Sequence, residues 1–249
     1  MVVFALEKNL LSENLKSLHQ EEARLRAITL EFIDENQKLE FELDVIHQCL
    51  DHLFAIVNGH VHRNEDELTI QRLGIRLFNA GASSLKAAFS GYYQIALLIV
   101  RDVNEILNLL DLFGLEKNRI SDWCTADDTK RFREYTPLKV RKALESHPGY
   151  EGQEAGRARI YKQLSTYAAH ASNNGFRLLG GADLQSNIGP FFDEPLLRAY
   201  LEETATQLTH AGLLFSMLFS DETEHLIREK QKFVSQLEKW KVSREQKPT

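Results

Sequence analysis

Arg101 and Glu105, within the stretch RDVNE, are the first residues whose types and spacing could support chemistry. They interrupt an otherwise apolar segment, IALLIVRDVNEILNLLDLF. Because they lie four residues apart, a helix would place both side chains on one face. A polar face on such an apolar helix must either contact water or find buried partners. The pair is therefore either an ordinary solvated ion pair or part of a functional site.

His170 is the next candidate, near the end of the stretch RIYKQLSTYAAHASNNG. Helical spacing places it on one face with Arg159, Gln163 and Thr166. The alanines around it would let another helix approach closely. A neutral imidazole can accept or donate a proton at cellular pH. The sequence leaves two interpretations open: a structural histidine bonded to a carbonyl or carboxylate, or a general acid or base.

Basic residues with interleaved tyrosines follow the Arg101 helix. The basic members are Lys130, Arg131, Arg133, Lys139, Arg141, Lys142, Arg157, Arg159 and Lys162. Cations pair with phosphates and aromatic rings stack on bases, so such a cluster suits RNA. The candidate RNA-binding residues are Arg131, Arg133, Arg141, Arg159 and Tyr161. Nearby acidic residues dilute the cluster, and a solvated helix face is the alternative interpretation.

Other kinds of site find little support in the sequence. The chain has no phosphate-binding loop, no dinucleotide fingerprint and no nucleophile elbow. The pairs Asp44-x-x-His47 and Glu222-x-x-His225 imitate only half of a di-iron bundle motif. We therefore expect no metal and no cofactor.

The elements that must position these residues are expected to be helices. The chain has 249 residues, 43% of them hydrophobic, with only 13 glycines and 5 prolines. So few helix-breaking residues, and no convincing strand alternation, predict an all-α helical bundle. The net charge of −6 disfavours a protein that wraps nucleic acid nonspecifically. Cys49 and Cys124 show no metal or redox spacing, and we expect reduced, mostly packed thiols.

The N-terminal region carries a long apolar heptad pattern. Residues 1–58 contain neither glycine nor proline. One heptad position is apolar throughout, at Leu11, Leu18, Leu25, Phe32, Leu39, Ile46 and Leu53. The other is polar in the middle, at Glu22, Thr29 and Asn36. This pattern predicts one long, coiled-coil-like helix over residues 1–58. The alternative is two shorter helices, broken near Asp34–Lys38 and packed on their own domain.

The rest of the chain is expected to form a helical core over residues 64–240, followed by a frayed tail at residues 241–249. Asn64 can cap a second long helix over residues 65–113. Shorter helices follow as far as a stop at Ser146–Gly149. Asp193 can cap a helix with Pro195 in its first turn, and Ser220 or Asp221 can cap the last helix.

Two segments together carry a resemblance to a known family. The stretches GYYQIALLIVRDVNEILNLLDLF and YKQLSTYAAHAS resemble bacterial helical proteins of the HEPN type, over roughly residues 85–180. The resemblance implies a helical bundle that dimerises and, in many members, a metal-independent RNase of defence or toxin–antitoxin systems. Such members carry an arginine and a histidine on one helix, with four to six residues between them. Here ten residues separate Arg159 from His170, so Arg101 would have to supply the cation.

Association is the function that the sequence favours. The long apolar seams predict a homo-oligomer in the form of a dimer, a protein partner bound through residues 11–57, or both. The alternative is a HEPN-like RNase in which the RNA 2′-hydroxyl attacks the adjacent phosphate. His170 would then be general acid or base, Arg101 would stabilise the developing charge, and Glu105 would orient one of them. We expect a cytoplasmic protein, because no signal peptide is apparent and the apolar run IALLIV is too short to span a bilayer.

Overall fold

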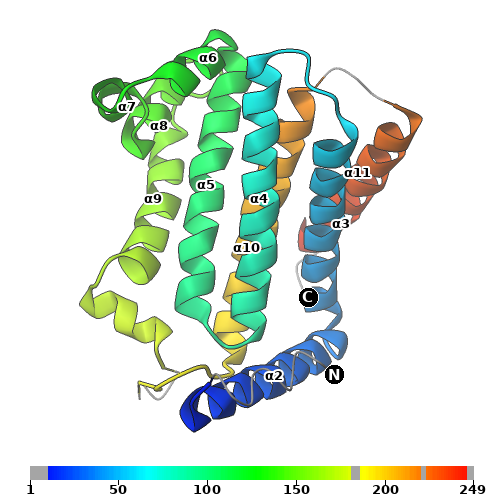
Figure 1. Cartoon of the computed structure of the whole chain (residues 1–249), viewed down its shortest axis with the longest axis vertical. Helices are drawn as coiled ribbons and strands as arrows, with labels where there is room; N and C mark the ends of the chain where they lie inside the picture. The colour runs from blue at the N-terminus through cyan, green and yellow to red at the C-terminus, as the bar shows by residue number, and fades with distance from the viewer. Residues whose placement is uncertain (1–10, 181–185, 220–222, 246–249) are drawn as a thin grey trace.

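Four long helices stand side by side at the centre of the molecule (Figure 1). They are α3 (Gln37–Gly59), α4 (Glu65–Phe89), α5 (Tyr93–Leu115) and α10 (Glu194–Met217). The computed structural model describes residues 11–180, 186–219 and 223–245, and every regular element in these ranges is helical. The prediction of an all-α helical bundle is therefore confirmed. No described helix combines the length and apolar character needed to cross a membrane.

Close approach of α10 to its neighbours depends on two glycines. A Cβ atom at Gly74 of α4 would lie 2.3 Å from the ring of Phe215, and one at Gly212 would lie 2.5 Å from the Cys49 sulfur. The missing side chains let Phe215 and Cys49 fill the space between the helices, and both are fully buried. The core is consequently continuous from α3 through α10 to α4 and α5.

Residues 11–58 form two helices, so the prediction of one continuous helix is wrong for them, and residues 1–10 lie outside the described ranges. Helix α2 (Glu13–Asp34) crosses one end of the bundle, and α3 enters it (Figure 1). Asn36 causes the break, since its Oδ1 accepts a hydrogen bond from the amide of Leu39 at 3.3 Å and starts a new helix. Both helices pack on their own domain, as the alternative interpretation states.

The polar heptad positions explain why α2 leaves the axis of α3. Thr29 donates a hydrogen bond to the carbonyl of Phe89 at 3.4 Å, and Glu22 accepts one from the hydroxyl of Tyr92 at 2.7 Å. These contacts hold α2 against the turn between α4 and α5. The apolar heptad residues of α3, such as Ile46 and Leu53, are fully buried in the same chain. The seam predicted to hold a partner is thus largely filled by the protein itself.

The second predicted helix, over residues 65–113, is also two helices. Asn64 caps α4 as predicted, with its Oδ1 accepting from the amide of Glu67 at 2.9 Å. The chain then reverses at Gly91, whose φ of +88° is a conformation that other residues rarely adopt. A Cβ atom there would lie 2.7 Å from the backbone of Phe191. Because only glycine permits that approach, α4 and α5 form an antiparallel hairpin.

Smaller helices flank the bundle. Helices α6 (Asn118–Thr125), α7 (Asp128–Glu134) and α8 (Pro137–Glu145) cover one end, and α8 stops at the predicted Ser146–Gly149. Helix α9 (Glu154–Leu164) packs along α5 and continues into the π-helical turn η1 (Ser165–Ala169) and the short 3₁₀ helix η2 (Asn173–Leu178). Outside these helices, the described chain has one isolated bridge, between Gly180 and Ser186.

Helix α11 (Glu224–Glu245) lies against α3 on the outside of the bundle (Figure 1). It buries Phe233, Leu237 and Trp240. Residues 241–245 continue this helix, so the predicted frayed tail is wrong for them, and residues 246–249 lie outside the described ranges. The predicted cap at Ser220 or Asp221 also lies outside. Asp193 caps α10 with Pro195 in its first turn, as predicted.

Candidate functional site

Arg101 and Glu105 form the expected ion pair, and α9 and η1 complete a cluster around it. Glu105 Oε1 lies 2.9 Å from the Arg101 guanidinium. The same guanidinium donates to Ser165 Oγ at 3.0 Å and to the hydroxyl of Tyr161. We call these four residues the Arg101 cluster. Arg101 is 25% exposed, so the cluster is neither fully solvated nor sealed. The N–H groups of the Arg101 guanidinium that could bind an anionic ligand are already engaged by Glu105, Ser165 and Tyr161.

Tyr161 lies between two arginines. The guanidinium carbons of Arg101 and Arg141 are each 4.8 Å from the centre of its ring. Arg141 is 7% exposed, and its nearest acidic partner is Glu154 at 3.5 Å. Two of its nitrogens, Nε and Nη1, find no hydrogen-bond partner among the described residues. Arg141 is therefore a buried structural cation, and not an exposed RNA contact of the kind the sequence predicts.

The π-helical turn η1 separates His170 from the Arg101 cluster. The amide of His170 donates to the carbonyl of Ser165 at 2.9 Å, and this five-residue spacing closes η1. The His170 side chain is exposed and has no hydrogen bond to Arg101 or any other described residue. Within one chain, Arg101 and Glu105 are thus brought together and His170 is not. The RNase mechanism stays a prediction.

The next turns of α5 carry a buried network of polar side chains that was not predicted from the sequence. Asp111 pairs with Arg157 of α9 at 2.6 Å and accepts a hydrogen bond from the Tyr150 hydroxyl at 2.7 Å. Arg157 also donates to Asn108 at 2.7 Å. Asn104 donates to Gln207 of α10 at 2.8 Å. We call this network the polar seam; its members are Asn104, Asn108, Asp111, Tyr150, Arg157 and Gln207. The available signal was the spacing of three polar α5 residues by four and three positions.

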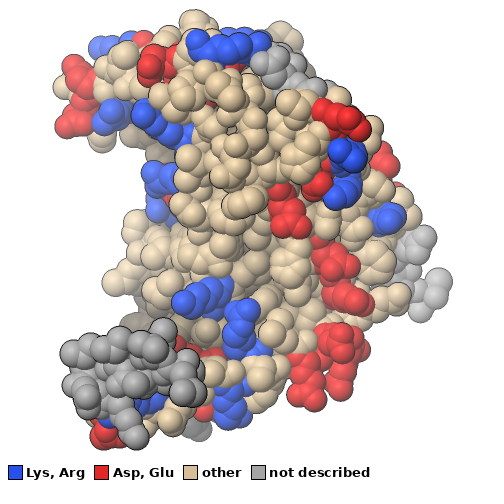
Figure 2. All heavy atoms as spheres, turned by 45° about the vertical axis from the view of Figure 1, so that its right-hand side comes forward, with Lys and Arg blue, Asp and Glu red and all other residues tan. Residues whose placement is uncertain are grey.

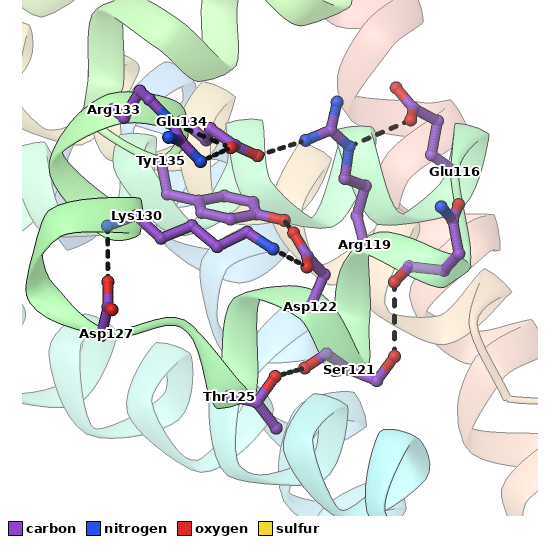
Figure 3. A network of polar contacts seen from close by, with 11 residues as sticks. Glu116, Arg119, Ser121, Asp122, Thr125, Asp127, Lys130, Arg133, Glu134 and Tyr135 are labelled. Carbon is purple, nitrogen blue, oxygen red and sulfur yellow. Dashed lines mark hydrogen bonds and ion pairs between the residues drawn. The ribbon is translucent and has the colours of Figure 1, made fainter.

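The basic cluster is largely neutralised by acidic neighbours (Figure 3). Lys130 pairs with Asp122, Arg133 lies 2.9 Å from Glu134, and Arg131 lies 3.5 Å from Asp128. Glu134 also accepts from Arg119 at 3.4 Å. Of the predicted RNA-binding residues, Arg131 and Arg133 are exposed but paired. Arg159 is exposed and forms no hydrogen bond or ion pair with a described residue, although its charge acts on Glu203. Paired charges give a weak net field, so the geometry favours the solvated-face interpretation.

The outer face of the bundle has a different character. Apolar side chains lie on the solvent side of α3, α4 and α5, at Phe54, Ile75, Phe78, Ile95, Leu98 and Ile99. Phe54 is 56% exposed and packs against Phe78, with ring centres 5.7 Å apart. Figure 2 shows a broad area without charged side chains, bordered on one side by a line of acidic side chains. We call this surface the outer face.

A groove runs along the outer face between α4 and α5. It has a volume of about 550 Å³ and is lined by Arg76, Asn79, Ala80, Ser83, Leu98, Ile99, Arg101, Asp102 and Glu105. Arg76 and Asp102 close one side through two hydrogen bonds of 2.6 and 2.9 Å. Apolar side chains flanked by alternating opposite charges make the groove suitable for another protein surface.

Within the described ranges, potential metal ligands and thiols add no further centre. Among the described residues, no three His, Cys, Asp or Glu side chains are grouped so that they could hold a metal ion. Cys49 is buried and donates to the carbonyl of Leu208 at 3.3 Å, whereas Cys124 is exposed, contrary to the expectation of a packed thiol. Comparisons with protein-family models, curated proteins and solved structures found no match. The HEPN-like resemblance therefore stays a prediction.

Proposed function

We propose that this protein works by association with a second copy of its own chain, through the outer face of α3, α4 and α5. The observation that carries the proposal is the exposure of large apolar side chains on three adjacent helices. Soluble proteins rarely leave contiguous apolar patches uncovered unless the patch is an interaction site. The partner surface thus differs from the predicted seam at residues 11–57, most of whose apolar positions are filled internally.

The groove between α4 and α5 supports a helix-on-helix contact. Leu98 and Ile99 stand beside Ala80, and small side chains at Asn79 and Ser83 leave room for an approaching helix. Burial of such a core contributes most of the affinity in protein interfaces, and a polar rim sets the orientation. The outer face has an apolar core, and the Arg76–Asp102 pair at its edge supplies a polar rim.

The charges at the groove favour a second identical copy as the partner. Each arginine lies beside an acidic residue: Arg76 beside Asp102, and Arg101 beside Glu105. In a two-fold symmetric dimer, every surface patch meets itself in reverse. A patch with balanced, alternating charges is self-complementary under that operation, whereas a patch of one sign would repel its own copy.

Sedimentation equilibrium on the full chain tests the proposal. We expect the wild-type chain to sediment as a dimer and the Leu98→Asp variant to dissociate at least about tenfold more readily, because a charge in the interface core must lose its water. Met217→Asp is the matched control. Met217 is 68% exposed at the end of α10, away from the outer face, and its replacement should leave the dimer intact.

The contrary outcomes are distinct. A wild-type chain that stays monomeric at its highest soluble concentration contradicts self-association. A dimer that Leu98→Asp and Ile75→Asp leave unchanged contradicts the choice of surface. Circular dichroism of each variant verifies that the substitution at an exposed position has left the helices folded.

A further inference from the structure

A small, largely apolar pocket lies on the other side of α5, where α9, η1 and α10 meet. Its volume is about 220 Å³. Apolar side chains form most of the lining, among them Leu97, Tyr167, Ala168, Leu196 and Ala199. Two polar side chains, Gln163 and Glu203, complete it. None of these residues belongs to the outer face, so the pocket is independent of the proposed association surface.

Among the described residues, Glu203 is the one acidic side chain that lines this pocket. One carboxylate oxygen, Oε1, accepts a hydrogen bond from the Gln207 amide at 2.9 Å. Its other oxygen has no hydrogen bond or ion pair from any described residue. Burial raises the pKa of this carboxyl above its ordinary value, in opposition to the Gln207 hydrogen bond and to the charges of Arg244 and Arg159, neither of which forms an ion pair with it. A half-buried carboxylate in an apolar wall is an acceptor that still lacks a strong donor.

The surrounding structure holds this carboxylate and the pocket wall in position. Gln207 is itself fixed by the hydrogen bond from Asn104, so the polar seam ends at Glu203. On the opposite wall, the π-helical turn η1 supplies Tyr167 and Ala168. The carbonyl of Ala168 accepts from Gln94 of α5 at 3.3 Å. Turns of this type widen a helix locally and are frequent at functional sites.

We propose that this pocket binds a small primary amine with an apolar body, whose ammonium group pairs with Glu203. The apolar lining favours a ligand with an apolar body, since moving an apolar group from water into an apolar cavity is favourable. The unpaired carboxylate oxygen dictates the head group, because a charge-assisted hydrogen bond is the strongest one it can accept. The volume dictates the size. An apolar cavity of about 150 Å³ holds benzene, so one of about 220 Å³ admits a ring with a short chain.

Calorimetric titration of the full chain with phenethylamine, and with 2-phenylethanol as its neutral analogue, tests this assignment. The wild-type chain should bind the amine at least about tenfold more tightly than the alcohol, because only the amine forms a charge-assisted hydrogen bond. Glu203→Gln should remove that preference while the alcohol still binds. Glu194→Gln is the matched control on the same helix, since Glu194 is exposed and pairs with Arg198 outside the pocket.

A second variant tests the place of binding. Ala199 is exposed and lines the pocket, so Ala199→Phe should fill the cavity and abolish binding of both compounds without disturbing the core. Equal affinity for amine and alcohol, no binding of either compound, or unchanged binding by Ala199→Phe would each overturn the assignment. All these outcomes leave the dimer test unaffected, because that test concerns residues of the outer face.

Discussion

Two contact regions within the same bundle are built on opposite chemistry. Where α3 meets α4, α10 and α11, the contacts are mostly apolar, with Ile46, Leu53 and Phe233 fully buried, and Trp240 adds one buried hydrogen bond to Glu42 at 2.7 Å. Where α5 meets α9 and α10, the polar seam joins Asp111, Arg157 and Gln207. The bundle is therefore held together in two ways. The contacts of α3 supply mainly hydrophobic stability, and the polar seam fixes the neighbours of α5 through directional bonds that must be complete.

Two ion pairs of α5 make this comparison measurable. Asp102 pairs with Arg76 of α4, and Asp111 pairs with Arg157 of α9, each at 2.6 Å. The first arginine is 64% exposed, whereas Asp111 and Arg157 are 5% and 14% exposed. The closest distance and the chemistry match, so the main difference between the two pairs is burial, to which Tyr150 and Asn108 add hydrogen bonds at the inner pair. Water can replace a lost partner at Asp102 and cannot do so at Asp111.

The largest expected effect is the loss of Arg157. Arg157→Met should lower the free energy of unfolding by about 4 kcal/mol, because it leaves the buried Asp111 carboxylate without its cation. Arg76→Met should cost below about 1 kcal/mol, since the pair it removes is largely in water. Urea denaturation followed by circular dichroism measures both. Equal losses in the two variants would show that the polar seam contributes no more than a surface pair.

His52 offers a pH-dependent test in the apolar region. It is fully buried in α3, stacks on Phe233 at 4.9 Å, and both ring nitrogens lack a described hydrogen-bond partner. Burial, assisted by the charge of Lys230, lowers its pKa from 6.5 to about 4, while Glu229 opposes the shift. Between these pH values the unfolded chain binds a proton that the folded chain does not. Stability should therefore fall by about 3 kcal/mol as the pH is lowered from about 6.5 to about 4.

Replacement of His52 isolates its share of that pH dependence. His52→Leu should flatten the curve of unfolding free energy against pH in this window, because it removes the contribution of His52. The carboxylates that titrate in the same window are present in both proteins, so their contribution is unchanged. His47→Leu is the control, since His47 is exposed on the same helix. If the curves of unfolding free energy against pH are parallel for the wild-type chain and His52→Leu, His52 binds its proton equally well in the folded and unfolded chains, and the expected effect is wrong.

Gly74 tests how tightly the apolar region is packed. Gly74→Ala places a methyl group 2.3 Å from the Phe215 ring, and we expect the unfolding free energy to fall by about 2 kcal/mol through overpacking. Gly156→Ala in α9 meets no atom within 4 Å, so it should gain up to about 1 kcal/mol from helix propensity. Thermal denaturation of both variants provides the comparison. A neutral Gly74→Ala would mean that α4 and α10 can separate without cost.

Local signals predicted many helix boundaries in this fold. The cap at Asn64 and the Asp193–Pro195 start of α10 depend on neighbouring residues, so the sequence contains their whole cause. The turn at Gly91 does not follow from local sequence, because apolar spacing continues across it. What selects the turn is a contact with Phe191, a hundred residues away. Periodicity cannot report such a contact.

The residues of the candidate site likewise fall into those that local sequence predicts and those that depend on distant contacts. Arg101 and Glu105 were predictable, because helical spacing alone brings them together. The Asp111–Arg157 pair joins residues 46 positions apart, so its geometry exists only after α9 has packed on α5. His170 was placed on the face of Arg159 by regular helical spacing. The π-helical turn η1 changes that spacing, so the predicted face does not continue to His170.

The smallest expected effect distinguishes stability from specificity in the polar seam. Asn104→Leu removes the donor that Gln207 Oε1 needs in a buried site, and should cost about 1.5 kcal/mol. Adding Gln207→Met removes the orphaned acceptor, so the double variant should return to within about 0.5 kcal/mol of the wild-type chain. A double variant nearly as stable as the wild-type chain would mean that this part of the seam serves to orient Glu203 at the pocket, with little contribution to stability.

Titration of the double variant with the amine should then show a smaller preference over the alcohol than the tenfold expected for the wild-type chain, because Glu203 has lost its hydrogen bond from Gln207. If the double variant is instead as unstable as the sum of its single substitutions, the two side chains act independently and the seam is not a connected network.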